Sequence, residues 1–351
     1  MSLPEEERPD LLREERFHDP HLFDLLLEAG HEALHCDPQR AGEILNLATG
    51  LAAMLEENGK RAGEIGAEGY SRALCLAGTA RRLLGDFPKA EAAFERAGGL
   101  PVSAASQGLF CRALAMLRWD QGRSEEATAL LYHAQRRFAE AQEMREEAAC
   151  LALLGMLHVD NGEPRRAVPL LREASQGIDP ERRPWLAAQC CLGLAFCHAS
   201  FGDTDKARSA REMAHSFYGK LSGEEDLLTR WLEGRVAALS GENEEAAALF
   251  ESVRPRLIER RRLPEATFAT IDLALLWSEA GRAAEVRGLV EELNAAFAGE
   301  PTVTVLEELL EALAEDTAAE RLDREVWSCV TLPLRMALRW QGASLWPLPF
   351  V

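Results

Sequence analysis

A glycine recurs about every 40 residues through most of this 351-residue chain, and a fixed pattern of small and apolar residues surrounds it. A small residue stands seven positions before the glycine. A small residue follows at five positions, a large apolar residue at nine and usually an alanine at twelve. The glycines are Gly85, Gly122, Gly162, Gly202, Gly241 and Gly281. Six copies in register indicate a repeat architecture, in which each unit packs mainly against its neighbours.

Each repeat unit contains two apolar segments with the period of an α-helix, separated by the glycine. The glycine provides the left-handed conformation that ends the first helix, and the small residues let the two helix axes approach each other. The first copy has Gly78 before the turn and Ala90, Phe94 and Ala97 after it, whereas Arg211 replaces the large apolar residue of the fourth copy. An earlier, weaker copy consists of Ala29, Cys36, Ala41, Leu45 and Ala48.

Helix start signals agree with this segmentation. An aspartate stands directly before a proline at Asp19 and at Asp37, which is typical of an N-cap followed by the first helical residue. The predicted helices are 20–36, 38–58, 62–84, 87–97, 103–121, 124–140, 143–161, 163–176, 184–201, 203–219, 224–240, 243–260, 264–280 and 282–298. A further pair near 302–315 and 317–341, bent at Pro333, is predicted to close the array.

The motif resembles the tetratricopeptide repeat over about residues 20–300. The repeats are longer than the usual length of about 34 residues, and the Trp and Tyr of the family's first helix are mostly absent. The opening Leu3–Gly30 and the helix start at Asp37 are similar to the sensor portion of bacterial regulators that carry an N-terminal helix-turn-helix. No DNA-binding segment precedes them in this sequence, so we expect that such a role would need a separate partner.

The resemblance implies an all-α fold: a right-handed superhelical solenoid of about seven or eight antiparallel helix pairs, whose first helices line a concave groove. We expect an N-terminal lead segment over 1–19, the repeat array over 20–300, and capping helices with an apolar tail over 301–351. The tail, 342–351, could cap the array, plug its groove or dock on a partner.

The composition favours a cytoplasmic protein that binds other proteins. With 39 basic and 58 acidic side chains the formal net charge is −19, which argues against direct binding to nucleic acid or to an anionic membrane. The sequence contains no signal-peptide pattern and no apolar run long enough to span a bilayer. We therefore expect the eight cysteines to be reduced thiols.

Two clusters could bind a metal, but neither predicts a metal or any other cofactor. His31, Glu32 and His35 match the H-E-x-x-H motif of zinc peptidases, although this helix is expected to stop at Asp37. The cysteines near His198 recur in repeat register, which is typical of core residues rather than ligands. A non-enzymatic protein is therefore expected, and a zinc metallopeptidase is a distant alternative.

The groove-facing positions are counted back from each glycine by thirteen, ten, six and three residues. The predicted partner-binding residues among them are Arg72, Thr79, Arg112, Met116, Trp119, Met156, Gln189, Phe196, Trp231, Arg235, Phe268 and Leu275. Aromatic, Met and Arg side chains are enriched in interface hot spots, and an exposed apolar groove marks a binding site. The alternative is that tight closure of the repeats buries these residues as ordinary core.

A run of arginines lies where one helix pair passes to the next: Arg254, Arg256, Arg260, Arg261 and Arg262. It is interpreted as compensation of a helix C-terminus, with docking of an acidic peptide as the alternative. The sequence thus predicts a non-catalytic adaptor or regulator that binds a protein or peptide segment in the groove. The second hypothesis is the sensory subunit of a transcriptional control system that acts with a separate DNA-binding protein.

Overall fold

The computed structural model describes residues 19–34, 37–57, 62–221, 223–260 and 263–297. Within these ranges the chain is helical and contains no strand. The residues form two compact units that divide within one helix, between Cys150 and Leu151. The predicted lead segment, C-terminal helix pair and tail lie outside the described residues, and the predicted domain boundaries stay a prediction.

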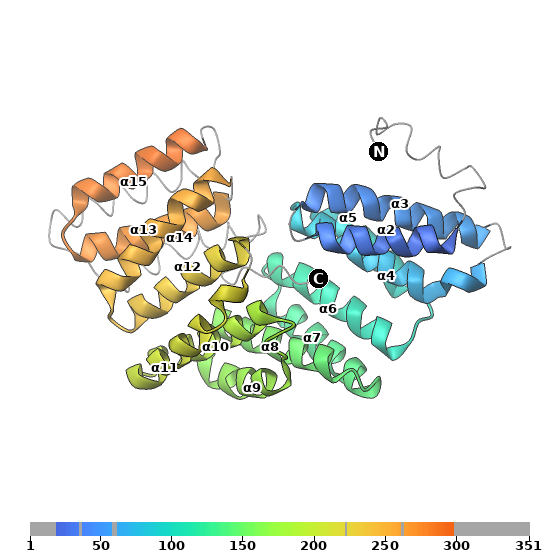
Figure 1. Ribbon diagram of the computed structural model, residues 1–351, viewed down its shortest axis with the longest axis horizontal. Helices are drawn as coiled ribbons and strands as arrows, with labels where there is room; N and C mark the ends of the chain where they lie inside the picture. The colour runs from blue at the N-terminus through green and yellow to red at the C-terminus, as the bar shows by residue number, and fades with distance from the viewer. Residues whose placement is uncertain (1–18, 35–36, 58–61, 222, 261–262, 298–351) are drawn as a thin grey trace. The chain divides into compact units, whose positions relative to one another are not determined.

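The first unit comprises successive antiparallel helices that pack against their neighbours (Figure 1). These helices are α2 (Pro20–Ala33), α3 (Pro38–Glu57), α4 (Ala62–Leu83), α5 (Phe87–Gly98), α6 (Ala104–Asp120), α7 (Ser124–Glu140) and the start of α8 (Met144–Asp160). Contacts link each helix of α2–α7 to the next, and α6 also packs on α4, the first helix of the preceding repeat. α4 contains a break at Gly66, where φ is 61° and ψ is 178°, which the sequence did not predict.

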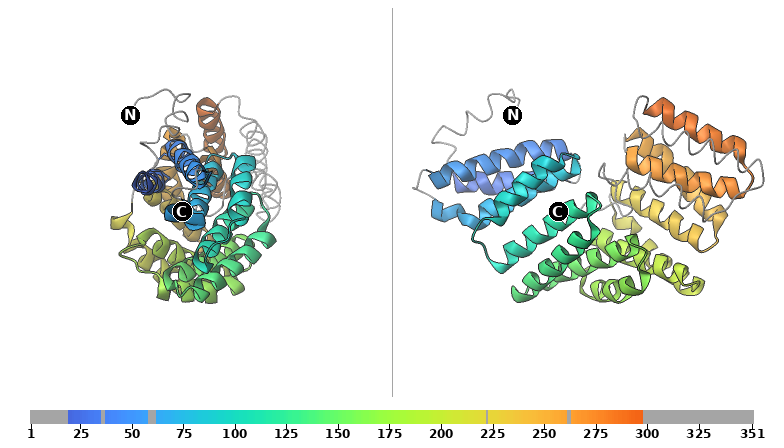
Figure 2. Two further views of the ribbon diagram at one scale, coloured as in Figure 1. Left: turned by 90° about the vertical axis from the view of Figure 1, so that its right-hand side faces the viewer. Right: turned by 180° about the vertical axis from the view of Figure 1, so that it is seen from behind.

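The second unit continues from Leu151 with the same alternation (Figure 2). Its helices are the rest of α8, α9 (Pro164–Gly177), α10 (Pro184–Ser200), α11 (Thr204–His215), the 3₁₀ helix η3 (Tyr218–Lys220), α12 (Gly223–Leu239), α13 (Asn243–Glu259), α14 (Leu263–Glu279) and α15 (Ala283–Ala296). The predicted helix over 203–219 is shorter in the structure. Its last turn tightens through bonds such as Phe217 N–H to the Ala214 carbonyl, at 3.0 Å, and η3 follows.

All six predicted turn glycines have positive φ, between 72° and 81°. After each glycine, the next residue donates its N–H to the carbonyl five residues earlier at 2.8–2.9 Å, as Asp86 does to Arg81. This is the Schellman arrangement that ends a helix in a left-handed residue. The turn between α7 and α8 uses the same bond, from Glu143 to Phe138, but Gln142 takes the glycine position with φ of 59°.

The small residue before each turn allows close packing within the pair, as predicted. A Cβ atom added to Gly78 or to Gly234 would lie 2.7 Å from the ring of Phe94 or Phe250, respectively. In the weak first copy, Gly30 approaches Leu45 in this way, whereas Ala29 is exposed, so the predicted position is wrong by one residue. Ala41, Leu45 and Ala48 are fully buried, as the pattern predicts.

The described cysteines lie in the helices as free thiols. Five of them are buried, and Cys111 is half-buried. Burial raises the pKa of the Cys75, Cys150 and Cys197 thiols to about 12. Their packing confirms the interpretation of these cysteines as core residues, because a buried thiol behaves as a small apolar group.

Candidate partner-binding site

Three successive first helices, α10, α12 and α14, bring four of the predicted partner-binding residues together in the second unit. α12 packs between the other two, with contacts to both. It carries Trp231 and Arg235 one helical turn apart, so both side chains lie on the same face of α12. Phe196 comes from α10 and Phe268 from α14.

The rings and the guanidinium form one continuous stack. The Arg235 guanidinium carbon lies 5.8 Å from the ring centroid of Phe196 and 5.7 Å from that of Trp231, within the range of a cation–π contact. The Trp231 ring in turn stacks on Phe268, with centroids 5.9 Å apart and an interplanar angle of 16°. The stack thus crosses the three helices in the order α10, α12, α14.

An aspartate that the sequence did not single out stabilises this arrangement. Asp272, on α14, accepts a hydrogen bond from Trp231 Nε1 at 3.1 Å, and the same oxygen lies 3.7 Å from Arg235 Nε. We call the five residues Phe196, Arg235, Trp231, Phe268 and Asp272 the aromatic–arginine ladder. The signal for Asp272 was a carboxylate in the middle of an apolar stretch of α14, but its partners come from another repeat.

Exposure divides the ladder into a surface and a support. Trp231 and Phe268 are fully buried, whereas the Arg235 side chain is 16% exposed. Phe196 and Leu275 are half-buried. The surface can therefore offer an aromatic ring, an aliphatic side chain and part of a guanidinium to an acidic or aromatic group of a partner.

Two other predicted residues of the second unit, Met156 and Gln189, are fully buried. Neither Nε2 nor Oε1 of Gln189 has a hydrogen-bond partner among the described residues. An amide in this state is costly for the fold, because burial removes its water without replacing the hydrogen bonds.

In the first unit only Arg72 of the predicted residues is exposed. Thr79 is buried and donates its hydroxyl to the Cys75 carbonyl at 2.8 Å. Arg112 pairs with Glu146 and lies 5.6 Å above the Phe138 ring. Met116 and Trp119 are buried in α6. Eight of the twelve predicted residues are thus enclosed by the fold, and the assignment of all twelve to partner binding stays a prediction.

A second polar network occupies the place where Arg211 interrupts the repeat motif. The Arg211 side chain is 8% exposed and pairs with Glu242 and Glu245, and its Nη2 lies 3.7 Å from Glu233 Oε1. Glu233 also accepts a hydrogen bond from Tyr218 at 2.9 Å and lies 3.2 Å from His215 Nε2. Burial raises the pKa of Glu233, against the opposing effect of His215, Tyr218 and Arg211.

The arginine run and the H-E-x-x-H motif are the remaining candidate clusters of the sequence. Arg254 is buried and holds α13 to its neighbours: it bonds Thr270 and the Leu289 carbonyl, each at 2.9 Å, so it does not face a ligand. His31 lies near the end of α2, and His35 lies outside the described residues. In the described part of the chain, no three His, Cys, Asp or Glu side chains are grouped so that they could hold a metal ion.

Comparison with known proteins supports the helical-repeat fold. The sequence profile of the tetratricopeptide repeat matches residues 108–131, 148–173 and 227–252. A Rap protein solved in complex with competence and sporulation factor aligns with a TM-score of 0.65, over 92% of this chain and 89% of its own, at 13% identity. The apo form of the quorum sensor NprR from B. thuringiensis aligns with a TM-score of 0.57 over 90% of each chain, at 14% identity.

No curated protein matches the sequence significantly. Among the described helices, none combines the length and the apolar character that crossing a bilayer requires.

Proposed function

We propose that this chain, a helical repeat protein of the tetratricopeptide type, is a non-catalytic adaptor or regulator that binds a segment of a partner protein. The binding surface in the second unit is the face on which α10, α12 and α14 carry the aromatic–arginine ladder. Phe196, Arg235 and Leu275 contact the partner, and the buried Trp231 and Phe268 hold these side chains in position. The observation that carries the proposal is the stack of two aromatic rings around the half-buried Arg235.

The chemistry of this surface favours a protein ligand. A guanidinium that is already flanked by rings loses little conformational freedom on binding, and Arg and aromatic residues provide most hot-spot energy. The ligand class is an extended or helical segment with apolar side chains and at least one carboxylate, which pairs with Arg235. In the first unit, Arg72 is proposed as a contact, while Thr79, Arg112, Met116 and Trp119 support that unit's own binding face.

A regulatory role is supported by the two structural neighbours. One is a Rap protein that was solved with competence and sporulation factor, and the other is named a quorum sensor. We extend from them only the general idea of a protein that responds to a ligand. The predicted cytoplasmic location and bacterial origin belong to this proposal, and reduced cysteines are consistent with that location.

Affinity purification followed by quantitative mass spectrometry tests the proposal. The tagged wild-type chain is compared with the double variant Phe196→Ala/Arg235→Gln, with Leu275→Ala, and with Arg287→Gln as the control, since Arg287 is exposed on α15. We expect one partner that the wild type and the control retain and that both the double variant and Leu275→Ala lose, at unchanged circular dichroism. Equal recovery of every partner by the wild type and by these two variants, when well folded, would reject the proposal.

A second candidate function is the sensory subunit of a transcriptional control system, favoured by the likeness to a quorum sensor. It differs in the identity of the partner. Recovery of a DNA-binding protein, whose binding to its DNA site changes when this chain is added, supports the sensory subunit. Recovery of a partner without DNA-binding activity supports the general adaptor.

A further inference from the structure

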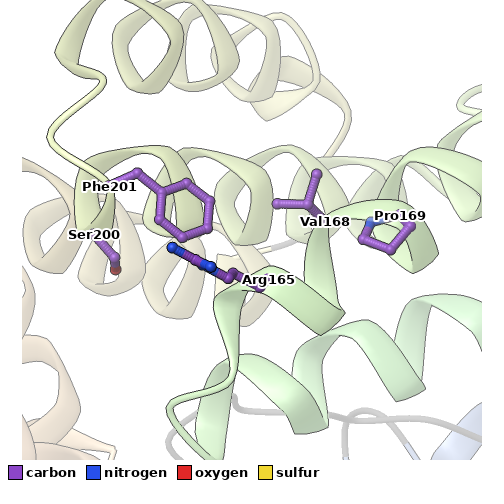
Figure 3. Close-up of a pocket in the computed structure, with 5 residues that line it drawn as sticks. All are labelled: Arg165, Val168, Pro169, Ser200 and Phe201. Carbon is purple, nitrogen blue, oxygen red and sulfur yellow. The ribbon is translucent and has the colours of Figure 1, made fainter.

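The second unit contains a pocket that shares no residue with the aromatic–arginine ladder. It has a volume of about 630 Å³ and is lined by Arg165, Val168, Pro169, Ser200 and Phe201. Figure 3 shows the Arg165 side chain extending from α9 toward the ring of Phe201, with Val168 and Pro169 further along the helix. Phe201 is 46% exposed, so its ring is accessible to a ligand in this pocket.

The pocket lies along one stripe of α9. Arg165, Val168, Pro169 and Arg172 are spaced at three, four and seven residues, so they share one face of the helix. Both arginines are exposed, and in the described ranges neither has an ion-pair partner. Pro169 has no N–H to donate, so the Arg165 carbonyl lacks the hydrogen bond that an ordinary helix would give it. The stripe thus offers two positive charges and a backbone acceptor around an apolar patch.

Comparison among the repeats shows that this basic stripe is confined to one of them. At the position of Arg165, the other five repeats have Pro88, Glu125, Asp205, Glu244 and Ala284. At the position of Arg172, they have Glu95, Tyr132, Glu212, Glu251 and Glu291. The residue before the turn glycine is aromatic only at Phe201. Two basic residues in one repeat and an aromatic residue in the next, in an otherwise acidic protein, indicate a ligand rather than a requirement of the fold.

We propose that this pocket binds a second protein ligand: a short acidic peptide segment with an aromatic side chain. The aromatic side chain packs on Phe201, Val168 and Pro169. Carboxylates on either side pair with Arg165 and Arg172, whose charges no described acidic residue neutralises within ion-pair distance. A peptide N–H donates to the Arg165 carbonyl. Because the stripe and the ladder are separate sets of residues, one chain can hold two partners, as a bridging adaptor does.

Fluorescence anisotropy tests this site in the full chain. The probe is a fluorescein-labelled synthetic peptide in which glutamates flank one phenylalanine, and the control peptide has glutamine at every glutamate position. We expect saturable binding of the glutamate peptide, weakened by salt because the contacts are ionic. Arg165→Glu and Arg172→Glu each weaken binding by about tenfold or more, since each replaces an attraction by a repulsion. Phe201→Ala also weakens it.

Two variants serve as controls for the proposed site. Arg287→Glu changes the net charge equally on another exposed helix position and leaves the affinity unchanged, as does the ladder variant Phe196→Ala/Arg235→Gln. The site is refuted if the glutamate peptide does not bind saturably, if the glutamine peptide binds equally well, or if Arg165→Glu has no more effect than Arg287→Glu. Tighter binding of a thymidine oligonucleotide than of the glutamate peptide overturns it in favour of nucleic acid.

Discussion

Replacing Gly234 by alanine should destabilise the protein, although alanine is the better helix former. The added Cβ would lie 2.7 Å from Phe250 Cε1, about 0.7 Å short of ordinary contact at 3.4 Å. Phe250 is fully buried, so its ring cannot move without disturbing the core of the second unit. Overpacking of this kind costs about 1–3 kcal/mol, and the helix propensity of alanine returns about 1 kcal/mol. We expect a net loss of up to about 2 kcal/mol.

The chain itself supplies the compensating change. At the large apolar position of the motif, phenylalanine occurs only in copies whose small residue before the turn is glycine, as in Gly78 with Phe94. Where that small residue is alanine, as at Ala115, the large apolar residue is Leu131. Introducing Phe250→Leu together with Gly234→Ala recreates the second combination. The shorter side chain makes room for the Cβ atom, so the double variant should be more stable than the sum of the single variants predicts, by about 1–2 kcal/mol.

Urea denaturation followed by circular dichroism measures these differences. The matched control is Gly288→Ala in α15, where an added Cβ meets no atom of the described residues within 4 Å. That substitution should stabilise the protein by about 0.5–1 kcal/mol through propensity alone. The packing argument is refuted if Gly234→Ala is as stabilising as Gly288→Ala, or if the effects of Gly234→Ala and Phe250→Leu are additive.

Three further predictions concern the turns, the buried carboxylate and the thiols. Gln142→Gly should stabilise the protein by about 0.5–1 kcal/mol in the same assay, because glycine adopts the left-handed conformation without steric cost; a loss of stability would contradict this. Burial raises the pKa of Glu233, so its ionised form is disfavoured in the folded state. The wild type should therefore gain stability relative to Glu233→Gln as the pH falls through that raised pKa. Stability curves for both proteins that run parallel from pH 8 to pH 5 would disprove this prediction. In the variant Cys36→Ser/Cys111→Ser/Cys329→Ser, which keeps the five buried cysteines, the remaining thiols should react with Ellman's reagent much more slowly at pH 8 in the folded state than in urea, because burial raises their pKa and blocks access. Fast reaction of all five without urea would contradict the buried packing.

The sequence was sufficient for the helices and turns because those depend on local signals. A turn glycine such as Gly85 ends its helix through its own positive φ. A pair such as Gly78 and Phe94 sets the close packing of two helices within one repeat. Predicted and observed helix ends therefore differ by only a few residues in most cases. The turn at Gln142 lies between the predicted helices 124–140 and 143–161, but the left-handed conformation of Gln142 was not predicted, because the hydrogen bonds of the turn impose a conformation that the residue type does not favour.

The candidate site was harder to predict because it depends on distances between repeats. Periodicity identified Trp231 and Phe268 as facing the same side, but it does not encode how closely successive first helices pack. The observed packing buries both rings and leaves Phe196, Arg235 and Leu275 partly accessible. Asp272 and the network around Arg211 have the same origin: each joins residues about 30–40 positions apart, and no local pattern pairs them.

The central claim, that the face formed by α10, α12 and α14 contacts a partner, is tested most directly by site-specific photocrosslinking. p-Benzoylphenylalanine is introduced at the position of Phe196 or, as the control, at that of Arg287, and each protein is irradiated with the partner that affinity purification identifies. We predict a covalent adduct with that partner from position 196 and none from position 287. Efficient crosslinking from position 287 with none from position 196 would contradict the proposed binding face.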